Sequence, residues 1–217
     1  MYDFYDTYRY IRCVYVDWIR KEIVQKEAET VVGLDFAMDG LYVSSEDERA
    51  NYPKFYREML DRLAKAQRVL SRRTKGSGRW HTQRIRVAKL HEKVANQRKN
   101  FLHHKSKELA THFDVVAIEN LNMKGMSQAL HFGKSVADNG WGMFTSFLAY
   151  KLNEQGKQLV KIDKWFPSTK TCSSCGNVKN MSLSERVYSC ICGVNLDRDY
   201  NAAINIKNEA IRLLALA

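Results

Sequence analysis

Four short apolar runs along the chain predict the strands of one sheet. Residues 31–37 form an apolar run long enough for a buried strand, and residues 40–44 follow it after a tight turn at residues 38–40. These two runs together predict a β-hairpin. The third and fourth runs cover residues 114–121 and 159–165. An earlier strand-like run, at residues 10–16, precedes the first of these strands and is followed by a charged stretch that has no assigned role.

Two long segments carry apolar residues at helical spacing, which predicts a pair of helices from residue 54 to 73 and from about residue 79 to 112. A glycine-containing break at residues 74–78 separates them. The stripes consist of Met59, Leu60, Leu63, Ala66 and Leu70 in the first segment and Val87, Leu90, Val94 and Phe101 in the second. This spacing is typical of two antiparallel helices packed along one seam, so the stripe is interpreted as core rather than as a cofactor site.

Two more helices are expected, one from about residue 140 to 155, ended by Gly156, and one closing the chain from residue 199 to about 216. The closing helix offers five apolar side chains to the core, namely Ile204, Ile206, Ala210, Ile211 and Leu214. Strands, intervening helices and carboxylates at strand ends indicate an α/β domain of the RNase H type.

Length and composition are consistent with one main domain. The chain has 217 residues, of which 45% are apolar, enough for one core and a small metal-held appendage. It contains no run of about 18 apolar residues, and its first residues lack the pattern of a secretion signal. We therefore expect a soluble, cytoplasmic protein.

The net charge of +11 is concentrated in one segment. Residues 54–112 hold 17 lysines and arginines against 4 acids, whereas the rest of the chain holds 18 against 20. Such a surplus is what a phosphate-binding surface requires, although a solvated helical face is the alternative. The candidate nucleic-acid-binding residues are Arg68, Arg72, Arg73, Lys75, Arg79, Arg84 and Arg86.

Four cysteines occur as two close pairs, Cys172 with Cys175 and Cys190 with Cys192, separated by 14 residues. Four thiolates at this spacing can surround a structural zinc ion, and the glycine after each pair suits a tight turn. The alternative, a buried or disulfide-bonded set, is less consistent with an intracellular chain. Cys13 is left over and is interpreted as a small buried apolar residue.

Three acids stand at or near the ends of predicted elements. Asp35 lies inside an apolar strand, Glu119 ends another, and Asp199 opens the last helix. Each has a simple structural explanation, as a solvated acid near a turn or, for Asp199, as a helix cap. Together they could hold two divalent ions about 3.5–4 Å apart, and oxygen ligands favour magnesium over zinc.

Several motifs together resemble one known family. They comprise Gly33-Leu34-Asp35, Ile118-Glu119-Asn120-Leu121, Asn139-Gly140-Trp141-Gly142, Phe166-Pro167-Ser168-Thr169-Lys170, the two cysteine pairs and Asp197-Arg198-Asp199-Tyr200-Asn201-Ala202-Ala203. In this order they are similar to the TnpB (OrfB) proteins of insertion sequences, which are RNA-guided DNA endonucleases with a RuvC-like nuclease domain, related to type V CRISPR effectors. The resemblance extends over residues 31–208.

The resemblance assigns roles to particular residues. It implies that Asp35, Glu119 and Asp199 are the catalytic acids, and Asp199 is preferred over Asp197 because the family motif places the ligand directly before the x-Asn-Ala-Ala run. It also implies that the four paired cysteines hold zinc in a ribbon inserted near the nucleic-acid channel. The second cysteine pair has a one-residue spacer where the family more often has two.

The resemblance also predicts a domain organisation. Family members usually carry a wedge and a recognition domain before the nuclease domain, whereas about 30 residues precede it here. We therefore expect a truncated member. Its expected parts are a remnant of the N-terminal module at 1–30, a RuvC-like core at 31–165 with the basic helical hairpin at about 54–112, a zinc ribbon at 166–196 and the end of the core at 197–217.

The leading functional hypothesis is an endonuclease that cleaves DNA with two magnesium ions and a structural zinc, with target DNA and guide RNA as partners. The alternative is a non-catalytic nucleic-acid-binding remnant that assists or interferes with a full-length relative. A third hypothesis is a transposase that joins DNA ends itself.

Overall fold

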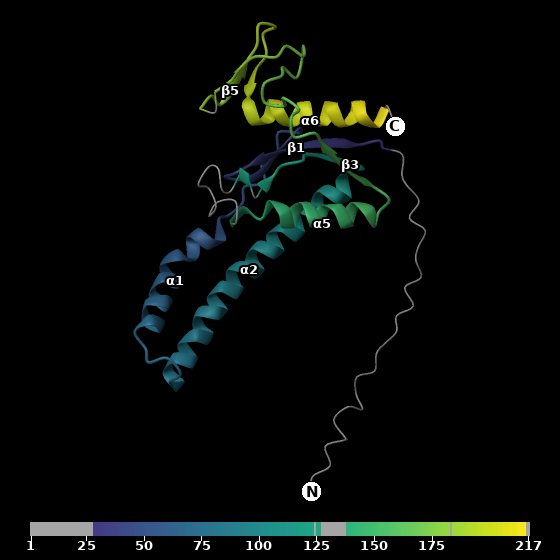
Figure 1. Ribbon diagram of the computed structural model, residues 1–217. Helices are drawn as coiled ribbons and strands as arrows, with labels where there is room; N and C mark the ends of the chain where they lie inside the picture. The colour runs from purple at the N-terminus through teal and green to yellow at the C-terminus, as the bar shows by residue number, and fades with distance from the viewer. Residues whose placement is uncertain (1–27, 124, 127–137, 183, 216–217) are drawn as a thin grey trace, which may run out of the picture.

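A four-stranded sheet forms the centre of the molecule in the computed structural model, which describes residues 28–123, 125–126, 138–182 and 184–215 (Figure 1). Its strands are β1 (Val31–Ala37), β2 (Leu41–Ser44), β3 (Val115–Glu119) and β4 (Gln158–Ile162), in the spatial order β2-β1-β3-β4. β1 pairs antiparallel with β2 and parallel with β3, and β3 pairs parallel with β4. The four predicted strands and the α/β class are confirmed.

Helices cover both faces of this sheet. α5 (Trp141–Asn153) and the C-terminal part of α2 (Gly78–His112) lie on one face, and α6 (Arg198–Ala215) lies on the other (Figure 1). Because neighbouring residues of a strand point to opposite faces, β1 divides its side chains between the two layers. Val32 and Leu34 belong to the main core with α2 and α5. Gly33 and Asp35 therefore face α6.

The basic segment folds as the expected helical hairpin. α1 (Phe55–Ser71) lies antiparallel to the N-terminal half of α2, and the pair projects away from the sheet (Figure 1). Met59, Leu63 and Val94 are buried between the two helices, where the Gln83 amide also donates to the carbonyl of Ala66 at 2.9 Å. The buried stripe excludes Leu60, which is 42% exposed, so the prediction for that residue is wrong.

One buried carboxylate joins this hairpin to the core. Oδ1 of Asp138 accepts hydrogen bonds from the Tyr52 hydroxyl at 3.2 Å and from the Arg98 guanidinium at 3.1 Å. The next side chain, Asn139, donates from Nδ2 to the carbonyl of Ala37 at 3.1 Å. The base of the hairpin is thereby held beside the C-terminal end of β1.

The closing helix α6 approaches β1 without an intervening side chain. A Cβ added to Gly33 would lie 2.2 Å from the carbonyl oxygen of Ala203 and 2.5 Å from the backbone N of Lys207. Only glycine permits this approach. Ile206 and Ala210 are buried on α6, but Ile211, one residue further, is 44% exposed. The prediction that Ile211 enters the core is wrong.

Some predictions fall outside the described residues, including the strand-like run at residues 10–16 and the burial of Cys13. Among the described helices, none is long and apolar enough to cross a membrane.

Candidate functional sites

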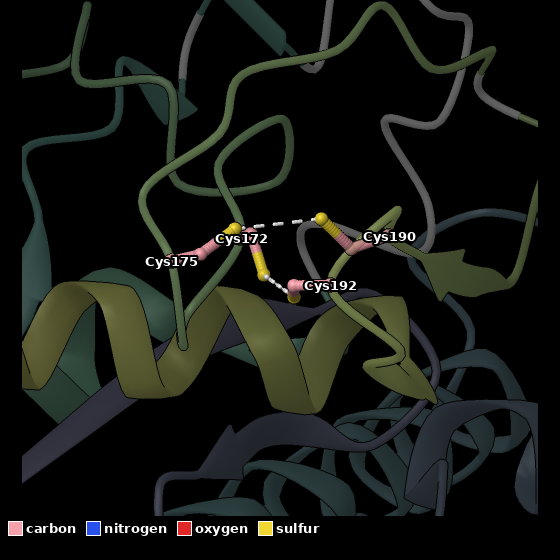
Figure 2. A group of neighbouring side chains, drawn as sticks. All are labelled: Cys172, Cys175, Cys190 and Cys192. Atoms are coloured by element: carbon pink, nitrogen blue, oxygen red, sulfur yellow. Dashed lines mark hydrogen bonds between the residues drawn. The ribbon is translucent and has the colours of Figure 1, made fainter.

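The four paired cysteines converge in a small ribbon that packs against the start of α6 (Figures 1 and 2). Their Sγ atoms all lie within 4.8 Å of one another, and two pairs are in contact at 3.6 Å, Cys172 with Cys192 and Cys175 with Cys190. Tetrahedral zinc with Zn–S bonds of about 2.3 Å has sulfur–sulfur distances of about 3.8 Å. The four thiols therefore could hold a zinc ion.

Tight turns bring the cysteines together. Gly176 and Gly193 have φ angles of 72° and 95°, a region that favours glycine, and each donates its backbone N–H to the carbonyl of the first cysteine of its pair. β5 (Val187–Ser189) and β6 (Asn195–Asp197) form the antiparallel hairpin that carries the second pair. Hydrogen bonding from the backbone N–H of Cys192 lowers the pKa of the Cys190 thiol to about 6. A lower pKa favours the thiolate form that binds metal.

The three candidate acids gather on the face of the sheet covered by α6. Asp35 faces α6 from β1, and Glu119 shares this face with Ala117, which packs against Ile206 of α6. Asp199 lies in the first turn of α6, one turn before the Ala203 that contacts Gly33. The fold therefore brings together residues from three separate parts of the sequence.

Burial, and then repulsion from the other two acids, makes ionisation of Asp35 unfavourable. The side chain is buried, and burial raises its pKa well above the ordinary value, with further contributions from the carboxylates of Glu119 and Asp199. The Arg198 guanidinium opposes this shift. Burial also raises the pKa of Glu119, and a hydrogen bond donated by the Ser168 hydroxyl reduces that increase. A cation placed among these carboxylates would offset the cost of their charge.

Asp197 and Asp199 have different roles, although they are two residues apart. Oδ1 of Asp197 accepts the backbone N–H groups of Asp199 and Tyr200 at 3.0 and 3.1 Å, so Asp197 caps α6, and it also pairs with Arg49 at 3.0 Å. Asp199 does not act as the cap. Its carboxylate accepts from the Arg198 guanidinium at 3.0 and 3.1 Å. This assignment leaves Asp199 as the acid at the sheet.

The carboxylates form a looser group than the thiols. Within the described part of the chain, the four cysteines are the one group of three or more metal-ligating side chains whose ligand atoms all lie within 4.8 Å of one another. Asp199 contacts Arg198 and Glu119 contacts Ser168, and both contacts compete with closer approach to Asp35. Sequence reasoning did not assign a role to Arg198 or Ser168, although both lie inside motifs that it singled out.

Two asparagines of α6 connect the ribbon to the acids. Asn201 donates from Nδ2 to the carbonyl of Thr171 at 2.8 Å and accepts the N–H of Ser173 at 3.0 Å. Asn205 donates to the carbonyls of Ser168 and Thr171, both at 2.7 Å. Because Ser168 also contacts Glu119, a continuous set of hydrogen bonds runs from the first cysteine pair to the candidate acid. These asparagines were also missed, although their spacing of four residues places them on one face of a helix.

The candidate nucleic-acid-binding residues lie around the far end of the helical hairpin, away from the sheet (Figure 1). All are exposed except Arg73, which is half-buried. The guanidinium of Arg84 lies 5.7 Å from the centre of the Trp80 ring, a cation–π contact that orients one of these charges. The structure therefore separates the basic tip from the acids.

Comparison with known proteins identifies the chain. The family model OrfB_IS605, described as "Probable transposase", matches residues 14–130, and the model described as "Cas12f1-like, TNB domain" matches residues 141–206. The chain belongs to the TnpB/OrfB family. This membership confirms the resemblance inferred from the motifs, and the second match covers the cysteine ribbon and the first half of α6.

Relatives of this family have names that describe an activity. A protein of Streptomyces pristinaespiralis named "Putative RNA-guided DNA endonuclease" is 39% identical over 81% of this chain and 44% of its own length. The protein InsQ of Escherichia coli K12, which carries the same description, is 28% identical over 86% of this chain and 50% of its own length. The chain thus spans about half the length of these curated relatives.

A solved structure has the same fold. A chain in the cryo-EM structure of a Cas12f1-sgRNA-target DNA complex superimposes with a TM-score of 0.62 at 19% identity, covering 85% of this chain and 51% of that one.

Proposed function

We propose that this chain is the nuclease part of a TnpB-like, RNA-guided DNA endonuclease with a RuvC-type active site formed by Asp35, Glu119 and Asp199. The observation that carries the proposal is the position of Asp35, buried beneath α6 with a pKa raised by burial and then by the other two carboxylates. A buried acid among acids is unfavourable for stability alone, which favours a functional explanation.

These carboxylates fit magnesium in their chemistry. All three offer hard oxygen ligands, and they come from rigid elements, two strands and the first turn of a helix. Bound magnesium would activate a water molecule and stabilise the leaving oxygen of a phosphodiester. Arg198 neutralises Asp199 in the structure and would exchange this contact for the metal or the scissile phosphate. Ser168 would keep the Glu119 carboxylate oriented.

The other two features have supporting roles in this proposal. The four cysteines bind zinc and order the ribbon, which Asn201 and Asn205 attach to the start of α6. The basic hairpin binds the phosphate backbone of the guide RNA or of the target DNA.

Reversing the charges of Arg68, Arg72, Arg73 and Arg84 together should lower the affinity for nucleic acid about equally for all sequences and make binding less dependent on salt.

The active-site assignment can be tested by replacing single acids. In a chimera in which residues 31–215 replace the matching region of the Streptomyces pristinaespiralis relative, supplied with that relative's guide RNA, Asp35→Ala, Glu119→Ala and Asp199→Ala should each reduce magnesium-supported cleavage to background. The reason is that two remaining carboxylates cannot hold both ions.

The matched control is Asp197→Ser, which keeps a helix-capping side chain and should keep cleavage. Cleavage by Asp35→Ala at the level of the unmodified chimera would refute the RuvC-type site. Cleavage by Asp199→Ala combined with inactivity of Asp197→Ser would move the third ligand to Asp197. Nucleic-acid binding by an unmodified chimera that cuts nothing would favour the alternative of a non-catalytic binding protein.

A further inference from the structure

Trp165 is an unusually exposed aromatic side chain in the turn between β4 and Ser168. Its exposed fraction is 80%, although tryptophan is usually well buried. It follows the C-terminal end of β4 by three residues. An indole in this position presents a large flat surface to solvent without contributing to the core.

The local turn directs this side chain outward. The Asp163 carboxylate accepts the backbone N–H of Trp165 at 2.7 Å, and the Asp163 carbonyl accepts the N–H of Phe166 at 3.1 Å. Phe166 packs inward against the core under α6. Two adjacent aromatic residues therefore point in different directions from a hydrogen-bonded turn, and the outward position of Trp165 is fixed by the backbone.

The turn lies at the edge of the sheet where the acids are found. β3 and β4 are parallel, and Glu119 is directly opposite Ile162, so the residues after Ile162 leave the sheet beside Glu119. The chain returns to Glu119 at Ser168, whose hydroxyl contacts that carboxylate. Trp165 is thus midway between two points fixed next to the candidate acid. Ligands of open α/β sheets bind at this carboxyl edge.

The segment that carries Trp165 is rich in lysine. The Nζ atom of Lys164 lies 4.9 Å from the centre of the indole ring, a cation–π contact that takes up one face. Lys161 and Lys170 are also exposed in this segment, where Asp163 is the single acid between residues 161 and 170. An exposed indole flanked by positive charges is the arrangement by which proteins bind single strands without sequence preference.

We propose that Trp165 is a stacking site for an unpaired nucleobase of the single DNA strand that enters the active site, with Lys164 near the adjoining phosphates. The inference deepens the proposed nuclease function and rests on it. Stacking of a base on Trp165 holds the strand beside Glu119 whatever the sequence of the strand is. Trp165 is accordingly a positioning residue and has no part in bond cleavage.

Binding of labelled oligothymidylate to the full chain, followed by fluorescence anisotropy without added magnesium, tests this site. Trp165→Ala should weaken binding about 10-fold, whereas Trp165→Phe, which keeps an aromatic face, should retain most of the affinity. An otherwise identical strand that lacks its bases should bind the unmodified chain and Trp165→Ala equally. Ile211→Ala, which removes an exposed apolar side chain from the C-terminal half of α6, serves as the matched control and should bind like the unmodified chain.

Equal affinity of Trp165→Ala and the unmodified chain for oligothymidylate would overturn the proposal. So would an equal loss for the strand without bases, since that result would indicate a general electrostatic or structural effect. Tighter Trp165-dependent binding of oligouridylate than of oligothymidylate would overturn the assignment to DNA. Because cleavage does not enter this measurement, its failure is distinguishable from failure of the nuclease proposal, which the single-acid variants test separately.

Discussion

The two candidate metal sites of this protein are built in opposite ways. The four thiols come from 21 consecutive residues, between Cys172 and Cys192, and local turns are sufficient to bring their sulfur atoms within 4.8 Å. The carboxylates of Asp35, Glu119 and Asp199 are about 80 residues apart from one to the next. They meet only because the sheet and α6 have formed.

This difference predicts different dependence on metal. The thiol site is arranged by turns whose glycines have positive φ angles, and a bound metal would stabilise a ribbon with little core of its own. The carboxylate site stands on a sheet with a large buried core of its own, and a metal would relieve charge repulsion there. Zinc should therefore determine local folding, and magnesium should determine activity.

The largest expected effect is the loss of the ribbon when a thiol is removed. Cys172→Ser should abolish stoichiometric zinc binding and increase hydrogen exchange in residues 166–196 before the sheet opens, because a structural zinc contributes about 10 kcal/mol to folding such a unit. Metal analysis and hydrogen exchange measure both results. Cys13→Ser is the control and should keep its zinc. Full zinc retention by Cys172→Ser, or loss by Cys13→Ser, would contradict the ligand assignment.

A second substitution should damage the carboxylate site without touching a carboxylate. Gly33→Ala places a methyl group against the backbone of α6 and should lower the free energy of unfolding by about 3 kcal/mol while weakening stabilisation by magnesium. Its zinc content should be unchanged. Urea unfolding with and without magnesium measures these effects.

Gly142→Ala is the matched control for Gly33→Ala. A Cβ at Gly142 would meet nothing within 4 Å, and alanine should stabilise α5 by about 0.5–1 kcal/mol. Unfolding of Gly33→Ala at the denaturant concentration of the unmodified protein would show that α6 shifts freely on β1 and that the acids are not fixed by this approach.

Removing the hydrogen bonds that connect the ribbon to the candidate acids should have an intermediate effect on stability. Asn205→Ala removes the donor to the carbonyls of Ser168 and Thr171 and should cost about 1–3 kcal/mol, with faster hydrogen exchange at residues 168–173. Asn208→Ala changes an exposed asparagine on the same helix and should have little effect. If exchange at residues 168–173 is the same in both variants, the ribbon and the acids are independent.

The smallest effect concerns pH. Because the pKa of Asp35 is raised in the folded state, the protonated carboxyl is favoured there, and without metal the free energy of unfolding should fall as pH rises above the unfolded value of about 3.8. Asp35→Asn removes this dependence and should be more stable than the unmodified chain at pH 7 by about 1 kcal/mol.

Asp39→Asn provides a control of opposite sign for Asp35→Asn. The Lys54 ammonium lowers the pKa of Asp39, so its carboxylate stabilises the fold above the unfolded pKa, and this contribution is lost as pH falls. Asp39→Asn should therefore bring no gain at pH 7. Thermal unfolding over a pH series distinguishes the two variants. A lower stability of metal-free Asp35→Asn at pH 7 would show that the Asp35 carboxylate is compensated in the fold.

Local patterns were sufficient to predict most elements and the thiol site. Continuous apolar runs predicted β1 and β3, which are buried on both faces, and apolar residues at helical spacing predicted the helical hairpin, whose buried side chains lie on one face. The two errors have the same cause. Leu60 and Ile211 each follow a buried residue, Met59 and Ala210, and one step along a helix turns a side chain by about 100° away from the stripe.

The contacts around the acids could not be predicted in this way. That Ser168 contacts Glu119 and that Asn205 holds the ribbon both depend on the closure of distant segments. Sequence spacing cannot show such closure. The family motif favoured Asp199 over Asp197 as the acid, but the two residues have the same chemistry, and the backbone geometry at the start of α6 is what shows that Asp197 is the cap.

The continuity of α2 gives the molecule a mechanical property. This helix has 35 residues and belongs to the core at one end and to the basic hairpin at the other. The part of α2 between Gly78 at the tip and Arg98, which pairs with Asp138, is one unbroken helix about 30 Å long. A tilt of α2 by about 5° about Arg98 would move the tip by about 3 Å, roughly half the rise of one helical turn. A nucleic acid bound at the tip would therefore exert a torque on the Arg98–Asp138 contact beside the end of β1, the strand that carries Asp35.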